Sequence, residues 1–250
     1  MKIKMHKLLE EPETPKVVAM VSFCTMFFFC GTVIMTLMSD GLWDNHTALS
    51  WFEIVFHLIC LAVTVPLMWE YLSFSWLIKG SESMKSFCLC LLTVLLVLVY
   101  SLVLQKMCQR GDLKEYYWIY ETAVPMLTNN LHLTNAYMVM VNPVFGTICA
   151  VLVAPVVTCC VFYATAFAKG YNVHPLLGYA LVILATLFLP FCTGILGMWE
   201  TGPEFAQWAV RLPIHLLCCK LYRDTDNIWM PIFAQAGVNL ISCLLVIFTW

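Results

Sequence analysis

Long apolar runs, bounded by charged and helix-breaking residues, divide most of the chain into six segments. Each run is nearly free of charge and approaches the roughly 20 residues that cross a ~30 Å bilayer core as a helix. They predict membrane spans at residues 17–38, 52–69, 84–104, 144–168, 175–198 and 228–248. We therefore expect an all-α integral membrane protein with six transmembrane helices.

The stretch from residue 107 to residue 143 is different, because polar side chains interrupt its aromatic and apolar positions. Asn129, Asn130 and His132 would all be buried if it crossed a membrane, and buried polar groups are costly there. We expect an extramembrane loop that connects a first repeat, residues 17–106, to a second, residues 144–249. The alternative is a seventh span within this stretch.

Two short segments break the pattern of full-length runs. Residues 73–80 and 202–212 each hold about half a membrane crossing of apolar-rich sequence. Ser73 or Ser75 can cap a helix start, while Pro203 suits a first helical turn and Glu204 complements the positive end of the helix dipole. These segments predict two half-helices.

The two half-helices occupy matching positions in the two repeats. Nearly the same interval separates the start of the first span from Ser73 and the start of the fourth span from Gly202. Because each repeat would cross the membrane three times, the second repeat would be inserted upside down. Inverted repeats with half-helices at mid-membrane are a recurring transport architecture.

This layout resembles the aquaporin superfamily, and within it the unorthodox superaquaporin branch, whose Asn-Pro-Ala motifs are degenerate. The stretches "PFCTGILGMWETGPEFAQWAV" and "NIWMPIFAQAGVNLISCLL" carry the likeness, with "SFS" and "GPE" at the motif positions. The resemblance implies that the half-helix starts meet at a pore centre formed by Ser73, Phe74, Ser75, Gly202, Pro203 and Glu204. It further implies a constriction near Glu53, His57, Pro190, Trp199 and Phe205.

The departures from that family concern its conducting residues. Both motif asparagines are absent, and Phe205 stands where conducting members usually have Arg. We expect passive transport of water or small neutral solutes such as glycerol or peroxide, through a path that is slow or closed. The alternative is a non-conducting membrane scaffold or assembly subunit on the same degenerate fold. Expected partners are the lipid bilayer, the solute, and a homo-tetramer or other membrane subunits.

Composition narrows the remaining function classes. The 250 residues are 62% hydrophobic and 11% charged, with a net charge of −2, which excludes a basic nucleic-acid-binding surface. Most of the thirteen cysteines lie in apolar runs, where cysteine is a small hydrophobe. Cys218 and Cys219 beside His215 fit no standard metal spacing, so we expect neither metal nor cofactor. The chain has no hydrolase or metalloprotease motif, so we expect no enzyme.

The distribution of lysines predicts the orientation of the chain. Lys2, Lys4, Lys7 and Lys16 precede the first span, and residues 39–50 have no Lys or Arg, which places the N-terminus in the cytoplasm. "NHT" makes Asn45 a glycosylation candidate on the opposite side. We expect an endoplasmic reticulum, other intracellular or plasma membrane location.

Overall fold

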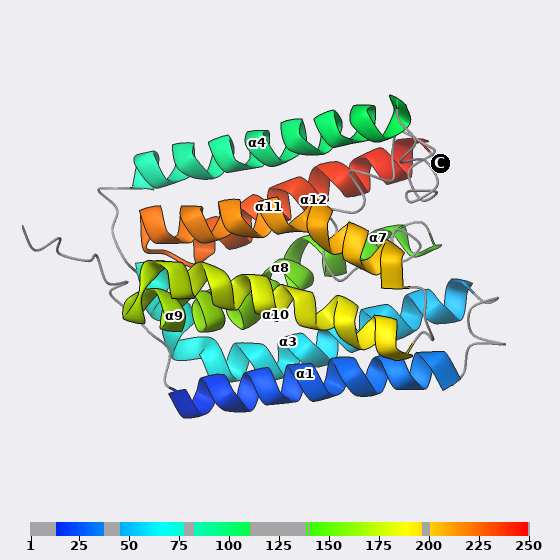
Figure 1. Cartoon of the computed structure of the whole chain (residues 1–250), viewed down its shortest axis with the longest axis horizontal. Coiled ribbons are helices and arrows are strands. Elements are labelled where there is room, and N and C mark those ends of the chain that lie inside the picture. Colours follow the sequence, from blue (N-terminus) through cyan, green and yellow to red (C-terminus); the bar gives the residue numbers. More distant parts are fainter. Residues whose placement is uncertain are drawn as a thin grey trace, which may run out of the picture.

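The computed structural model describes residues 14–37, 46–77, 83–110, 139, 141–196 and 201–249, and within these ranges it contains helices and no strand. The helices lie side by side along one long axis (Figure 1). Their bounds are α1 Thr14–Leu37, α3 His46–Leu77, α4 Ser83–Arg110, α7 Pro143–Ile148, η3 Cys149–Val153, α8 Ala154–Thr158, η4 Cys159–Phe167, α9 Ala168–Val173, α10 Pro175–Leu196, α11 Thr201–Thr225 and α12 Trp229–Thr249.

Three described segments are long and apolar enough to cross a membrane. They are Ser50–Trp76, Met84–Val103 and Pro143–Val173, and shorter apolar helices lie at Thr14–Cys24, Pro175–Leu187 and Trp229–Leu244. Together these six segments fall in the six helical stretches that the hydrophobic pattern predicts. The chain is therefore an all-α protein with membrane-spanning character, as expected.

The two predicted half-helices are wrong as separate elements. Residues 73–77 continue α3 without a break, and residues 202–212 form the first half of the 25-residue helix α11, which runs on past Pro213. A continuous helix pairs its backbone N–H and C=O groups internally, whereas a break would leave such groups unpaired in apolar surroundings. The polar residues that suggested helix ends therefore lie within longer helices.

An unbroken helical stretch, α7 to α9, forms the centre of the bundle. It contacts α1, α3, α10, α11 and α12, and 56% of its spanning window is buried, compared with 22% for the window in α4. This helix is apolar on all sides, and such a helix is typically surrounded by others.

The central helix is distorted where Pro155 follows the π-helical turn η3. The backbone N–H of Ala154 bonds to the carbonyl of Cys149, and Pro155 has no N–H to donate. Consequently neither residue supplies a donor to the carbonyl of Ala150. The side chain of Asn239, on α12, does so instead, with Nδ2 2.7 Å from that oxygen.

Close backbone contact joins α9 to α10 across the turn at His174. A Cβ atom added to Gly170 would lie 2.8 Å from the Cα atom of Gly178, and one added to Gly178 would lie 2.8 Å from the backbone nitrogen of Tyr171. Real Cβ atoms do not approach other atoms so closely. Glycine at both positions therefore allows these two helices to pack.

The two ends of the bundle are held by different polar contacts. At the end we call the Lys16 end, Lys16 Nζ lies 2.5 Å from a Glu70 carboxylate oxygen, and Trp229 Nε1 donates to the carbonyl of Leu72 at 2.8 Å. At the opposite end, the Asn142 end, Asn142 Nδ2 donates to Ser50 Oγ at 2.7 Å. Both contacts of the Lys16 end involve the last turns of α3, and Ser50 lies in its second turn.

Pairs of aromatic side chains pack together at both ends of the bundle. Trp76 packs edge-on against Trp229 with ring centroids 5.2 Å apart, and Trp51 lies 5.5 Å from Phe145. Trp51 and Trp76 are separated on α3 by about 25 residues, or about 37 Å at 1.5 Å per residue. This separation suits a ~30 Å hydrocarbon core with tryptophan at both interfaces.

Candidate functional site

Three polar side chains from three helices form a hydrogen-bonded chain inside the bundle. Gln235 Nε2, on α12, donates to the hydroxyl of Tyr163, on η4, at 2.8 Å. The same hydroxyl lies 2.8 Å from Nδ1 of His215, on α11. All three residues are buried. We call them the polar cluster.

The order of donors and acceptors gives the polar cluster a direction. A tyrosine hydroxyl has one proton, and since it accepts from Gln235 it is free to donate that proton to His215 Nδ1. A neutral imidazole that accepts at Nδ1 carries its own proton on Nε2. With that tautomer of His215, the hydrogen bonds run from amide to hydroxyl to imidazole, and they join Tyr163 and His215, two groups that can both give and take a proton.

The polar cluster lies deep in the apolar part of the bundle. Gln235 follows the interfacial Trp229 by about 9 Å along α12, and Asn239 follows it by about 15 Å, at 1.5 Å per residue. The middle of a ~30 Å hydrocarbon core lies about 15 Å from either interface, so Asn239 lies near the middle and Gln235 lies between the middle and the interface. Polar groups buried there are costly unless they are paired, so their presence calls for a structural or functional reason.

The local structure explains how Tyr163 and His215 meet. Tyr163 lies on the π-helical segment η4, and π-helical turns are frequent at functional sites. His215 is held between the rings of Phe162 and Tyr163, both edge-on, with centroids 5.7 and 5.9 Å away. The imidazole thus has aromatic neighbours as well as one strong hydrogen bond.

A small cavity adjoins the polar cluster between α4, α11 and α12. Its volume is about 10 Å³, which is room for about one water molecule. Oε1 of Gln235 is buried and has no hydrogen-bond partner. The residues lining the cavity are Val97, Ile214, Cys218, Ala234, Gln235, Val238 and Asn239.

Cysteines surround the polar cluster without forming a metal site. The Cys218 thiol lies beside Tyr163 and Gln235, and Cys159 and Cys219 lie nearby, fully buried. Within the described part of the chain, no group of three His, Cys, Asp or Glu side chains could hold a metal ion. The polar cluster therefore offers hydrogen bonds rather than metal ligands.

The described structure does not bring together the two residue sets that the aquaporin resemblance implies at a pore centre. The buried hydroxyls of Tyr71 and Tyr222 hydrogen-bond to each other, so the last turns of α3 lie beside the end of α11. Gly202 precedes Tyr222 on α11 by about 30 Å at 1.5 Å per residue. The predicted sets Ser73, Phe74, Ser75 and Gly202, Pro203, Glu204 consequently lie near opposite ends of the bundle.

The residues of the first set have unrelated surroundings. Ser75 is buried, whereas Phe74 is 52% exposed. Ser73 Oγ donates to the carbonyl of Glu70 at 3.0 Å within its own helix. A shared pore-facing role is not apparent from these contacts.

The predicted constriction residues are spread over several helices. His57 lies on the buried face of α3, edge-on to the ring of Phe56 at 5.8 Å. Glu53 also belongs to α3, Pro190 to α10, and Phe205 to the first turns of α11. Trp199 and the glycosylation candidate Asn45 lie outside the described residues.

Sequence reasoning missed Gln235, Asn239 and Tyr163, and it considered His215 only beside Cys218 and Cys219 as a possible metal site. Gln235 and Asn239 are four positions apart, so they share one face of α12. A Gln–Asn pair at this spacing in an otherwise apolar span is a signal that could have been followed. The sequence around Tyr163 has no comparable signal, because the position of Tyr163 beside His215 depends on how η4 and α11 pack.

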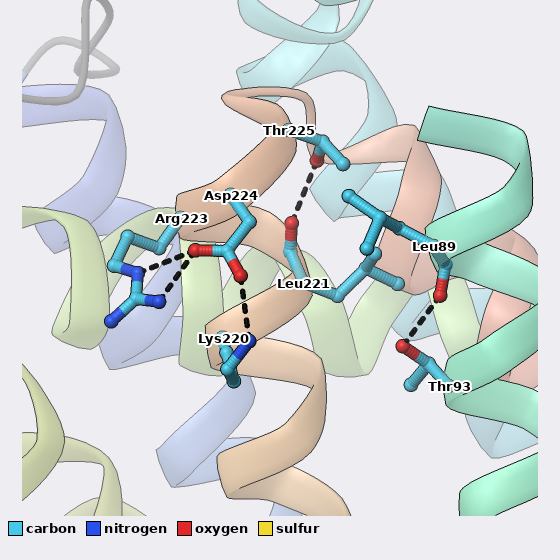
Figure 2. Close-up of polar contacts among 7 residues, drawn as sticks. All are labelled: Leu89, Thr93, Lys220, Leu221, Arg223, Asp224 and Thr225. Carbon is cyan, nitrogen blue, oxygen red and sulfur yellow. Dashed lines mark hydrogen bonds and ion pairs between the residues drawn. The ribbon is translucent and has the colours of Figure 1, made fainter. Parts of the chain in front are cut away.

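Three charged side chains interact in the last turns of α11, at the Lys16 end of the bundle. Asp224 accepts from Lys220 Nζ at 2.8 Å and from Arg223 Nε at 2.7 Å (Figure 2). Burial alone would raise the pKa of the Asp224 carboxyl, but the hydrogen bonds from Lys220 and Arg223 hold that pKa below its ordinary value. The chain therefore leaves its apolar region near this ion pair.

The geometry thus combines a buried amide, hydroxyl and imidazole, a water-sized cavity and charged residues at the end of the same helix. These groups can form hydrogen bonds and exchange protons. Comparison of the chain with protein-family models, with curated proteins and with solved structures finds no match.

Proposed function

We propose that this protein provides a passive path across a membrane for water or a small neutral solute. The observation that carries the proposal is the hydrogen-bonded polar cluster, Gln235, Tyr163 and His215, buried in an apolar bundle. Intramembrane polar residues that face the bundle interior commonly mark solute or proton pathways. The solute class is the one that the aquaporin resemblance implies, but the pore architecture of that family is not part of the proposal.

On this proposal, the described conformation corresponds to a closed path. The cavity beside the polar cluster has a volume of about 10 Å³, less than a glycerol or even a chain of waters requires. Opening would require α4, α11 and α12, which line this cavity, to separate. A slow or gated permeability is therefore expected.

The charges favour an orientation with the Lys16 end in the cytoplasm. The described basic residues at that end are Lys16, Lys85, Lys169, Lys220 and Arg223, whereas the last turns of α4, at the other end, contain Lys106 and Arg110. Cytoplasmic ends carry the excess of Lys and Arg. This orientation agrees with the one expected from the N-terminal lysines, and it places residue 46, where α3 begins, on the opposite side.

Swelling of proteoliposomes tests the proposal directly. The purified chain is reconstituted, and light scattering after an osmotic step gives the permeability to water, glycerol and peroxide. We expect at least one permeability above that of empty vesicles, and a several-fold change in Tyr163→Phe. Tyr179→Phe, a half-buried tyrosine of α10 outside the polar cluster, is the matched control and should behave as wild type.

The alternative function is a non-conducting membrane scaffold or assembly subunit. The small size of the cavity favours it, since polar side chains shared between helices can serve simply to hold them together. This alternative predicts permeabilities equal to those of empty vesicles for all three solutes and a stoichiometric membrane partner on purification. Such a result would overturn the transport proposal.

A further inference from the structure

Gln235, which lines the cavity between α4, α11 and α12, has an unsatisfied polar atom, and such an atom indicates a ligand. Gln235 is 6% exposed, and its Oε1 has no hydrogen-bond partner while its Nε2 is bonded to Tyr163. A buried acceptor without a donor costs about 1–3 kcal/mol. A molecule in the cavity that donates a hydrogen bond would remove this cost.

The cavity lining restricts what that molecule is. Four lining residues are aliphatic, and the others are Cys218, Gln235 and Asn239, with no charged side chain among them. A cation or anion would therefore find no counter-charge. A volume of about 10 Å³ limits the ligand to the size of one water molecule.

Asn239 supplies the second polar partner. An asparagine amide has two N–H groups and one carbonyl oxygen, and the donation to Ala150 uses only one of the N–H groups. A bound molecule can therefore contact the Asn239 amide and the Gln235 amide together, with the Cys218 thiol as a further weak partner. Buried waters typically have about three such contacts.

We infer that this cavity is a binding site for one water molecule, which donates to Gln235 Oε1 and also contacts Asn239. The water extends the polar cluster into a chain that runs from Asn239 through water, Gln235 and Tyr163 to His215. That this water is also the transported solute rests on the proposed function, whereas the binding of the water to the cavity does not. The site favours water over glycerol, which the cavity cannot hold.

Radiolytic hydroxyl labelling tests the site on the full chain in lipid nanodiscs. Brief X-ray exposure generates hydroxyl radicals from water where it is bound, and mass spectrometry measures the oxidation of nearby thiols. Cys218, 1% exposed, lines the cavity, whereas Cys243 is equally buried, at 0%, on α12 and does not line it. We expect Cys218 to be oxidised at least several-fold faster than Cys243.

Two variants separate this site from general water penetration. Ala234→Leu fills the cavity, and Gln235→Met removes the acceptor at similar size, so each should lower Cys218 oxidation to the Cys243 rate. Equal oxidation of the two thiols in the wild type overturns the inference without any variant. Oxidation of Cys218 that persists in both folded variants also overturns it.

The labelling measurement tests the water site and the swelling measurement tests transport, so either proposal can be rejected without the other. Rapid Cys218 oxidation with no permeability above empty vesicles would leave the water site standing and remove the transport proposal. Permeability without selective Cys218 oxidation would leave transport standing and remove this site.

Discussion

The outer helix α4 and the central helix α7–α9 are both apolar enough to cross a membrane. Hydroxyls on both helices bond to their own backbone, as Thr165 does to Val161 in the central helix, but the central helix also bonds to polar side chains of two neighbouring helices. On α4, Thr93 Oγ1 donates to the carbonyl of Leu89 at 2.9 Å, four residues earlier (Figure 2). Ser101 does the same with Val97. In the central helix, Ala150 and Tyr163 bond to Asn239, Gln235 and His215 on neighbouring helices.

This difference arises because α4 is a regular helix on the outside of the bundle, whereas the central helix is irregular and buried. A regular helix pairs its own backbone and can face lipid without further support. A helix with π-helical turns and an internal proline has carbonyls that need donors from elsewhere. The central helix is therefore stable only inside the bundle, and it is where polar side chains of several helices meet.

The largest expected effect comes from the backbone contact of the central helix. Gly170→Ala should lower the free energy of unfolding by about 3 kcal/mol, because the new Cβ would overlap the backbone of Gly178. Gly237→Ala is the control at the α4–α12 contact, where a Cβ would lie 3.5 Å from Val94 Cγ2, an ordinary distance. Thermal unfolding in detergent compares them. Equal stability of the two variants would contradict the close packing of α9 and α10.

The second-largest expected loss of stability comes from removing the Asn239 amide, which bonds to the distorted turn of the central helix. Asn239→Leu should cost about 2 kcal/mol, because the Ala150 carbonyl is left buried without a donor. Thr93→Val, on α4, should cost at most about 0.5 kcal/mol, because the Leu89 carbonyl belongs to a regular helix.

A second substitution sharpens this test. Pro155→Ala restores a backbone N–H near the Ala150 carbonyl, so Asn239→Leu should cost less in that background. The double-mutant cycle measures the coupling. Additive costs would show that Asn239 does not act through the carbonyl that Pro155 leaves unpaired.

A smaller cost is expected within the polar cluster. Tyr163→Phe removes the hydroxyl between Gln235 and His215 and should lower the free energy of unfolding by about 1 kcal/mol. Ser101→Ala, on α4, should cost only a few tenths, about 0.3 kcal/mol, because its partner Val97 keeps its helical bond. Chemical denaturation gives both values. A Tyr163→Phe protein as stable as Ser101→Ala would mean that the polar cluster adds nothing to stability.

The smallest effect concerns the ion pair in Figure 2. Because the folded pKa of Asp224 is lowered, its contribution is fully present above the unfolded value of about 3.9. It is lost as the pH falls through the folded pKa. Asp224→Asn should therefore be less stable than wild type at pH 7, by about 0.3 kcal/mol. A gap that persisted after the carboxyl had been protonated would exclude this ionic cause.

The hydrophobic pattern was sufficient to predict the helices that contain the six apolar runs. It was not sufficient for α11, where Pro203 and Glu204 at the start of a short apolar-rich segment predicted a half-helix at 202–212. Local signals describe where a helix can end, but packing against α10, α12 and α4 decides whether it does. For the same reason, Ser73 and Ser75 predict a helix start where α3 is continuous.

That the chain is helical and apolar enough for a membrane can be read from the amino-acid sequence, because these properties depend on composition and on runs of about 20 residues. Which polar residues meet depends on how the helices pack. Gln235, Tyr163 and His215 lie on three helices far apart in the sequence, and their contact depends on the rotation and depth of each helix. A hydrogen bond requires atoms to lie within about 3 Å, and no single-chain pattern of hydrophobicity specifies positions that closely.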